Sequence, residues 1–293
     1  MNLTGEPESS RQGPSLGETQ GKDFAGRVMV VTGAAGGIGA AAAQRLADRG
    51  AALVLLDRSA DLLESVENSC REAGSDVLSL GVNQANGALV EEGIAHAVDR
   101  FGRIDGLFAN AGYGQFAPFL DTTAKNWQRH VDVNLHGTFH VCQAVARQIA
   151  AQKSGGAIVL NASSGAQTYA DQLFAYCATK AAIQMMGVGM ASELGVHRIR
   201  VNTILPGVIE TPMTSSMLED PRHKDVMLAE TPVGRLGDPQ DVAALVAFLL
   251  SDDAGFITGA SVPIDGGQTI HAFPRWFRLD YRDAHNANWS VPG

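Results

Sequence analysis

A strand, a glycine-rich turn and an alanine-rich helix follow one another early in this chain. The segment Arg27–Thr32 is apolar and rich in β-branched residues, as a buried strand would be. It runs into Gly33-Ala-Ala-Gly-Gly-Ile-Gly39, and a helix is expected from about residue 40 to 49. Gly33 would permit the tight turn, Gly37 would let a pyrophosphate approach the backbone, and Gly39 would let helix and strand pack closely. The turn therefore predicts a dinucleotide bound at the helix N-terminus.

The spacing of these glycines is G-x3-G-x-G, which meets the general G-x-G-x-x-G fingerprint only loosely. A glycine-rich turn without a ligand is therefore the alternative. The next strand, Ala52–Asp57, favours the dinucleotide, because it ends in a carboxylate 18 positions after Gly39. A carboxylate at about this distance is typical of a group that binds the adenosine ribose hydroxyls.

Asp57 also bears on the choice of cofactor. A carboxylate there would repel the 2′-phosphate of NADP, and Gly36 offers no cation to offset it. Arg58 is a contrary sign, because its guanidinium could turn toward a phosphate, although such a residue is more often a solvated loop charge. The sequence predicts NAD as the cofactor.

Tyr176 and Lys180 lie four residues apart in an apolar, helix-compatible stretch, so they would share one helix face. A nearby ammonium favours the phenolate and lowers a phenol pKa that starts near ~10. Bringing the pKa to about 7 would require roughly 4 kcal/mol. The pair would then provide a base that takes a proton from an alcohol near neutral pH.

Strand-like and helix-like segments alternate as far as Gly267, which predicts a parallel, doubly wound sheet. With 293 residues, of which 45% are apolar, the chain suffices for one large domain. We expect a flexible tail over 1–24, the domain over 25–267 and an aromatic-rich extension over 268–293. That extension would pack over an active-site mouth or a neighbouring subunit, or simply dock on the surface. Its aromatic residues are Phe273, Trp276, Phe277, Tyr281 and Trp289.

Charge and cysteine content exclude several classes of function. A net charge of -9 and a pI near 5.3 argue against binding nucleic acid or an anionic membrane surface. Cys70, Cys142 and Cys177 form an odd, unpatterned set, which predicts free thiols in a reducing compartment. No apolar run approaches ~18 residues and no secretory segment precedes the first strand, so a soluble cytoplasmic protein is expected.

His136 and His140 are four apart on an expected helix and could mimic a metal-binding pair. The sequence places no carboxylate or third histidine beside them. No metal site is predicted.

Two motifs together resemble the compact subgroup of the short-chain dehydrogenase/reductase family: Thr-Gly-x-x-x-Gly-x-Gly at 32–39 and Tyr-x-x-x-Lys at 176–180. The resemblance extends from about Arg27 to Gly267. It implies a single Rossmann-type α/β domain, a parallel seven-stranded sheet with helices on both faces, in a homotetramer or homodimer. It also covers Asn110-Ala-Gly112, Asn134, Ser163 and Pro206-Gly207.

The resemblance implies a catalytic tetrad of Asn134, Ser163, Tyr176 and Lys180. Tyr176 would act as general base or acid, and Ser163 would hydrogen-bond the same substrate oxygen. Lys180 would hold the nicotinamide ribose and tune the phenol, while Asn134 would hold a water that relays the proton. Ser164 is the alternative for the serine role, and a purely structural asparagine is the alternative for Asn134.

The resemblance also implies a set of cofactor contacts from the turns that follow the strands. Asn83 departs from the pattern, since relatives usually have Asp there, but its carbonyl oxygen can still accept from the adenine amine. Thr211 would bind the nicotinamide carboxamide, or merely start a helix ahead of Pro212. The full set is Gly33, Gly36, Gly37, Ile38, Gly39, Asp57, Arg58, Asn83, Asn110, Ala111, Gly112, Tyr176, Lys180, Pro206, Gly207, Ile209 and Thr211.

A mixture of apolar side chains and glutamines is expected around the substrate. It suits a medium-sized secondary or cyclic alcohol, including a diol or polyol, and the alternative for each residue is an ordinary place in the core. An NAD-dependent alcohol dehydrogenase is thus the leading hypothesis. An NADPH-dependent carbonyl reductase, for example of 3-oxoacyl thioesters, and a non-catalytic dinucleotide sensor are the alternatives. The expected pocket residues are Gln115, Gln167, Phe174, Met213 and Met217, with Tyr113, Phe116 and Ala166 nearby.

Overall fold

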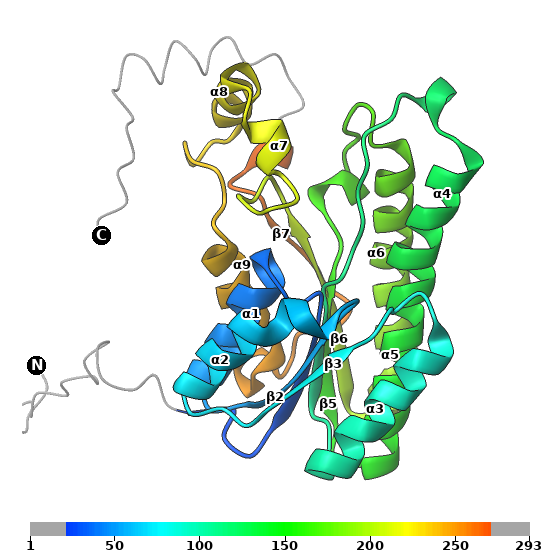
Figure 1. Cartoon of the computed structure of the whole chain (residues 1–293), viewed down its shortest axis with the longest axis vertical. Coiled ribbons are helices and arrows are strands. Elements are labelled where there is room, and N and C mark those ends of the chain that lie inside the picture. The colour runs from blue at the N-terminus through cyan, green and yellow to red at the C-terminus, as the bar shows by residue number, and fades with distance from the viewer. Residues whose placement is uncertain (1–21, 271–293) are drawn as a thin grey trace, which may run out of the picture.

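The computed structural model describes residues 22–270, which form a parallel sheet covered by helices on both faces (Figure 1). Within those residues the sheet has seven strands in the order β3-β2-β1-β4-β5-β6-β7. The order reverses direction between β1 and β4, which is where α/β sheets of this kind open a binding crevice. The strands are β1 (Val28–Thr32), β2 (Ala52–Asp57), β3 (Val77–Gly81), β4 (Gly106–Ala109), β5 (Gly156–Asn161), β6 (Ile199–Pro206) and β7 (Ser261–Ile264).

Helices α1, α2 and α9 cover one face of the sheet, and α3, α5 and α6 cover the other (Figure 1). α7 and α8 lie at the end of the molecule where α1 begins. A π-helical segment, Val131–His136, joins α4 to α5. The α-helices are α1 (Gly37–Asp48), α2 (Glu64–Glu72), α3 (Gly87–Phe101), α4 (Ala124–His130), α5 (Gly137–Gln152), α6 (Phe174–Leu194), α7 (Ser215–Leu218), α8 (Pro221–Glu230) and α9 (Pro239–Leu250).

The two faces of the sheet build two apolar cores. In β1, Met29 and Val31 pack with α1 and α9, whereas Val28 and Val30 pack with the α3 and α5 side. All five residues of β1 are buried. Burial on both faces is why the strand is a continuous apolar run rather than an alternating one. The predicted fold class is confirmed.

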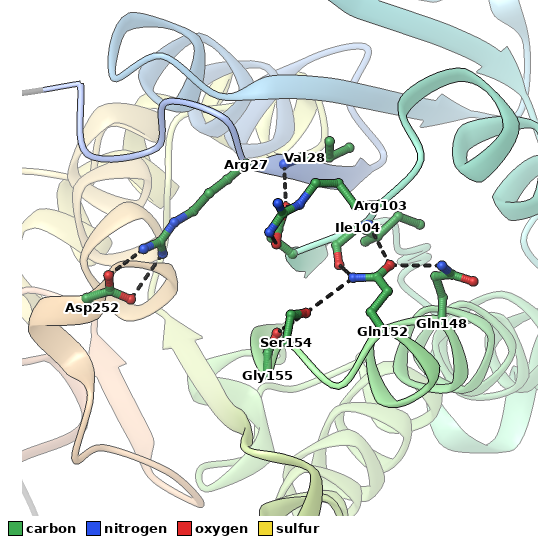
Figure 2. Close-up of polar contacts among 10 residues, drawn as sticks. Arg27, Val28, Arg103, Ile104, Gln148, Gln152, Ser154, Gly155 and Asp252 are labelled. Atoms are coloured by element: carbon green, nitrogen blue, oxygen red, sulfur yellow. Dashed lines mark hydrogen bonds and ion pairs between the residues drawn. The ribbon is translucent and has the colours of Figure 1, made fainter.

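A polar network fixes the starting ends of β1 and β4 (Figure 2). Asp105, just before β4, accepts a hydrogen bond from the Val28 amide at 2.9 Å and two from Arg103 at 2.9 and 2.6 Å. Gln152, at the end of α5, bonds both the amide and the carbonyl of Ile104, at 2.9 and 2.8 Å. These bonds set the relative position of the two strands whose opposite ends flank the crevice.

The packed domain extends slightly beyond the predicted limits of 25 and 267. Phe24 is fully buried and its amide donates to the Arg49 carbonyl at 3.1 Å. Gln268 accepts from the Val208 amide at 3.1 Å and donates to Thr231 at 2.9 Å. The rest of the predicted tail and the aromatic residues after 270 lie outside the described residues. No helix within 22–270 is long and apolar enough to cross a membrane.

Candidate active site

The glycine turn after β1 has the geometry that its sequence predicts at two positions. Gly33 has φ +61°, in the left-handed region that favours glycine. A Cβ at Gly39 would lie 2.0 Å from the Gly33 carbonyl oxygen, so this position requires the close packing of helix on strand. Gly36 precedes α1 and has nothing within 4 Å of its would-be Cβ, which leaves the helix N-terminus open to a ligand.

Gly37 lines the cavity beside the turn, so its predicted closeness to a pyrophosphate stays a prediction. Its φ of +53° is a further reason for glycine at this position. A Cβ there would lie 3.2 Å from the Thr211 side chain, so Gly37 also lets the segment after β6 close on the turn.

A cavity of about 430 Å³ opens beside the turn, at the carboxyl ends of β1, β4, β5 and β6. Sixteen of the predicted catalytic and cofactor-binding residues line it, so the fold brings together segments that are far apart in the sequence. They are Gly33, Gly36, Gly37, Ile38, Asp57, Arg58, Asn110, Ala111, Gly112, Ser163, Tyr176, Lys180, Pro206, Gly207, Ile209 and Thr211.

A second cavity of about 320 Å³ shares five lining residues with the first: Gly33, Asp57, Arg58, Ala111 and Gly112. The Asp57 carboxylate accepts from the Ala35 amide at 3.1 Å and from the Arg58 amide at 2.8 Å, so it is held in place. Asn83 lines this cavity, but its carbonyl oxygen already accepts from the Ala85 amide at 3.2 Å. The predicted bond from adenine to that oxygen would have to share it.

Asn110 ties the glycine turn to two strands. Its amide nitrogen donates to the carbonyls of Thr32 and Gly33 at 3.0 and 3.1 Å, and its oxygen accepts from Asn161 at 2.8 Å. The side chain is thus committed to shaping the crevice, while Asn110 still lines the cavity wall.

Helix α6 carries Tyr176 and Lys180 into the cavity, and Ser163 faces them from the turn after β5. The Lys180 ammonium is buried and lies 5.5 Å from the centroid of the Tyr176 ring. Ser163 is close enough to Tyr176 to act on its phenol, and its hydroxyl accepts a hydrogen bond from the Gly165 amide at 3.0 Å. Ser163 lines the cavity and Ser164 does not, which distinguishes the two serines in favour of the predicted one.

The expected effect of Lys180 on the phenol is not what the structure shows. Burial raises the pKa of Tyr176, and the hydrogen bond from Ser163 lowers that pKa by less. The same burial lowers the pKa of Lys180 to about 8, since a low-dielectric site disfavours an ammonium. Burial therefore acts against the charged form of both groups, and it opposes the expected lowering of the phenol pKa.

Asn134 lies in the π-helical segment and is fully buried. Its oxygen accepts from the Tyr113 amide at 2.7 Å, and its nitrogen donates to the Tyr113 carbonyl at 2.9 Å and to Thr179 at 3.0 Å. Both ends of the amide are therefore occupied by protein partners. The side chain positions the segment after β4 against α6, and any water that it helped to hold would have to share these bonds.

Comparisons with known proteins agree with this geometry. A family model described as enoyl-(acyl carrier protein) reductase matches residues 33–269. L-Rhamnose 1-dehydrogenase (NAD(P)(+)) of Sphingomonas sp. strain SKA58 is 36% identical over 247 residues, which cover 84% of this chain and 97% of that protein. D-Threitol dehydrogenase of Mycolicibacterium smegmatis is 38% identical over 248 residues, with coverage of 84% and 94%. A solved structure of NAD+-bound xylitol dehydrogenase is 37% identical with a TM-score of 0.80, covering 83% of this chain and 99% of that one.

The chain belongs to the short-chain dehydrogenase/reductase family. The predicted class, an oxidoreductase of the alcohol dehydrogenase type that uses a nicotinamide cofactor, is confirmed.

The cavity contains most of the expected cofactor residues but few of the expected substrate residues. Met213 lines the cavity. Gln115 and Gln167 are exposed outside it, and Gln115 accepts a hydrogen bond from the Tyr113 hydroxyl. Met217 lies half-buried in α7, away from the cavity lining.

Phe174 also points elsewhere. Its ring packs edge-on against Phe119 at 4.8 Å and stacks with Trp127 at 5.7 Å, so it joins an aromatic cluster between α4 and α6. The cluster closes the outside of the segment after β4 rather than the cavity.

Sequence reasoning missed two residues of the site. A Cβ at Gly114 would lie 3.4 Å from the Tyr176 ring and 3.9 Å from the Met213 sulfur, so this glycine lets the segment after β4 pass close to the phenol. Its position two residues after Gly112 was a usable signal. Asn161 accepts a hydrogen bond from Lys180 through its backbone carbonyl. Every residue has this group, so the sequence does not indicate the role.

The two histidines considered for metal binding have different partners. His136 Nδ1 lies 3.3 Å from Asp132, and His140 Nδ1 lies 3.2 Å from the Gln84 carbonyl. Among residues 22–270 there is no cluster of three or more histidine, cysteine or acidic side chains placed to hold a metal ion.

Proposed function

We propose that this enzyme oxidises a small secondary alcohol, cyclic or polyhydroxylated, with NAD, and catalyses the reverse reduction of the ketone. The observation that carries the proposal is that Tyr176, Ser163 and Lys180 line the same cavity as the glycine turn. The phenol that would transfer the proton thus lies in the cavity where the nicotinamide end of a dinucleotide would bind. The relatives named for rhamnose, threitol and xylitol support a polyhydroxylated substrate.

The residues of the cavity fit a nicotinamide dinucleotide. Gly36 leaves the N-terminus of α1 open, where N–H groups and the helix dipole favour a pyrophosphate. The side-chain oxygen of Asn161 is a buried acceptor with no partner among the described residues, at the cavity wall, and would take a hydrogen bond from a ligand. When bound, the nicotinamide supplies the hydride acceptor for the carbinol carbon.

Each of the three polar residues has a distinct role in this proposal. Tyr176 takes the hydroxyl proton during oxidation and returns it during reduction. Ser163 donates a hydrogen bond to the same substrate oxygen as it changes between alcohol and carbonyl. Lys180 holds the cofactor ribose and keeps a positive charge near the phenol, and the charge of an oxidised nicotinamide acts in the same direction. Asn134 keeps the segment after β4 in place beside them.

NAD is preferred over NADP in this proposal because the Asp57 carboxylate is fixed in the cavity wall. A 2′-phosphate beside it would be repelled. Arg58 lines both cavities and is exposed, so it favours some residual use of NADP. An NADPH-dependent reductase of acyl substrates is the second candidate. The description of the matching family model, enoyl-(acyl carrier protein) reductase, supports it.

The experiment is a panel of sugars, alditols, cyclic diols and simple secondary alcohols, each assayed with NAD and with NADP by absorbance of the reduced cofactor. We expect turnover with polyhydroxylated or cyclic alcohols and a higher kcat/KM with NAD. Turnover only of 3-oxoacyl thioesters with NADPH would instead select the second candidate. Tight NAD binding with no turnover of any alcohol or ketone would select the non-catalytic sensor.

We also propose that the enzyme is a homodimer or homotetramer. Phe139 on α5 and Met185 and Val188 on α6 are exposed apolar side chains, which supports a covered interface on this side of the molecule. Light scattering of Met185→Glu against the wild type would test it, with a smaller particle expected for the variant. The three cysteines are free and buried, which supports a reducing, cytoplasmic location.

A further inference from the structure

His130 is the last residue of α4, and it is fully buried behind the segment that follows β4. Its Nδ1 lies 2.9 Å from the Asn126 carbonyl oxygen, and its Nε2 lies 3.2 Å from the Gln115 amide. A carbonyl can only accept and a backbone N–H can only donate. The ring is therefore neutral, with its hydrogen on Nδ1 and the lone pair of Nε2 facing Gln115.

The segment Tyr113–Gln115 runs past the Tyr176 ring and is hydrogen-bonded on either side of that contact. Tyr113 is bonded through both its amide and its carbonyl to Asn134. Gly114 passes against the Tyr176 ring. The backbone amide of Gln115 donates to His130, and within the described part of the chain this is the one hydrogen bond of that amide.

The ring of Tyr113 strengthens the link between this segment and α4. It lies 4.3 Å below the Arg129 guanidinium and 4.7 Å from the His130 ring, so two successive residues of α4 contact one tyrosine. A shift of His130 would therefore move Tyr113 as well as Gln115.

We propose that His130 is a positioning residue for the segment Tyr113–Gln115, and that its protonation at acid pH releases this segment and weakens substrate binding. A protonated imidazole has two N–H donors. Its Nε2–H would then face the N–H of Gln115, so an attractive hydrogen bond becomes a repulsive contact between two donors. The segment beside Tyr176 then loses its hydrogen bond at Gln115 and is held at Tyr113.

The groups around His130 keep it neutral at physiological pH. Burial lowers its pKa, and the neighbouring Arg129 charge lowers it further, while the Asn126 carbonyl acts in the opposite direction. Tyr113 faces it from the segment after β4, and Tyr176 on α6 faces the same segment at Gly114. The Asp132 carboxylate accepts from Gln128 and lies by His136 instead. Release of the segment is therefore expected only below the usual histidine pKa of about 6.5.

The test compares wild type with His130→Gln in the direction of ketone reduction, using the ketone of the best alcohol from the panel. Reduction consumes a proton, so the chemistry of Tyr176 does not weaken at acid pH. In wild type, KM for the ketone should rise about tenfold between about pH 7.5 and about pH 5, with a smaller change in kcat. His130→Gln keeps an acceptor for the Gln115 amide but cannot titrate, so its KM should change no more than about twofold. The exposed His136→Gln is the matched control and should follow the wild type.

Hydrogen exchange of the segment 112–117 in the full-length wild type tests the same inference without catalysis. After correction for the intrinsic rate, the Gln115 amide should lose about tenfold protection between pH 7.5 and 5, and should keep it in His130→Gln. The kinetic measurement rests on the proposed function, whereas the exchange measurement does not. A failure of the proposed function can therefore be distinguished from a failure of the inference about His130. Equal protection of Gln115 at both pH values in wild type would overturn the inference, as would an unchanged acid rise of KM in His130→Gln.

Discussion

Lys180 donates a hydrogen bond of 2.6 Å from its buried ammonium to the backbone carbonyl of Asn161, the last residue of β5. The bond anchors a side chain of α6 to the end of a sheet strand, at the wall of the cavity. It holds the amine 5.5 Å from the Tyr176 ring centroid. The strand end thus fixes where the positive charge lies.

Removing this amine should affect catalysis far more than folding. For Lys180→Met we expect kcat to fall by at least about 100-fold, because the positive charge near the phenol is lost, together with weaker binding of NAD, because the contact with the cofactor ribose is lost. Initial rates with NAD and cofactor titration by fluorescence would measure both effects. Lys125→Met, an exposed lysine on α4, is the control and should keep wild-type rates.

The same substitution should stabilise the protein at neutral pH. Burial lowers the pKa of Lys180 from 10.5 to about 8, so at pH 7 the folded state holds a charge that the cavity disfavours. Replacing it with Met should raise the free energy of unfolding by about 1–2 kcal/mol.

The pH dependence of this effect has a definite sign. Between about pH 8 and 10.5 the unfolded chain binds a proton at Lys180 that the folded chain has released, so wild-type stability rises with pH there. The advantage of Lys180→Met should therefore shrink between pH 7 and pH 9.5 in urea unfolding. A variant that is less stable than wild type by the same amount at both pH values would contradict the assigned cause.

Two glycines of one turn should respond differently to a methyl group. Gly39→Ala would place Cβ 2.0 Å from a backbone oxygen, so we expect destabilisation of more than about 2 kcal/mol. Gly36→Ala meets open space and has an extended φ of −176°, so it should fold normally but bind NAD more weakly, because the methyl would enter the ligand path. Thermal unfolding and NAD titration separate the two. Gly189→Ala, on the open surface of α6, should be stabilising by about 0.5–1 kcal/mol.

The hydrogen bonds of Asp105 at the starting edge of the sheet should contribute more to stability than the exposed ion pair between Arg27 and Asp252. Asp105→Ala would leave the buried Val28 amide unsatisfied and should cost about 1–3 kcal/mol. Asp252→Ala breaks the surface pair with Arg27 and should cost no more than about 1 kcal/mol. Chemical denaturation of both variants would check the ranking. Equal losses would mean that the strand ends are not held in the way described.

The sequence was sufficient for the fold and for the segments that the fold gathers at the glycine turn. Continuous apolar runs, separated by helix-like segments, predicted the parallel sheet, because parallel strands are buried on both faces. Gly33 and Gly39 could be assigned because backbone conformation and close packing select glycine directly. Tyr176 and Lys180 could be paired because a helix fixes which residues share a face.

The substrate side could not be predicted in the same way, because it depends on how loops fold over one another. A parallel bridge pairs Ala117 with Leu173, and this draws Phe174 into contact with Phe119 instead of the cavity. The protonation of Tyr176 was also out of reach, since its pKa depends on burial that only the folded chain provides. Asn161 acts through a backbone carbonyl, which any residue carries.

The most direct measurement of the central claim is turnover of the best alcohol with NAD by wild type and Tyr176→Phe, side by side with NAD affinity. The substitution removes only the phenolic oxygen from a ring that remains packed in the cavity wall. We predict that nearly all turnover is lost, by at least about 100-fold, while NAD affinity stays within a few-fold of wild type. Wild-type turnover in Tyr176→Phe would contradict the account, because the proton would then be moving through another group.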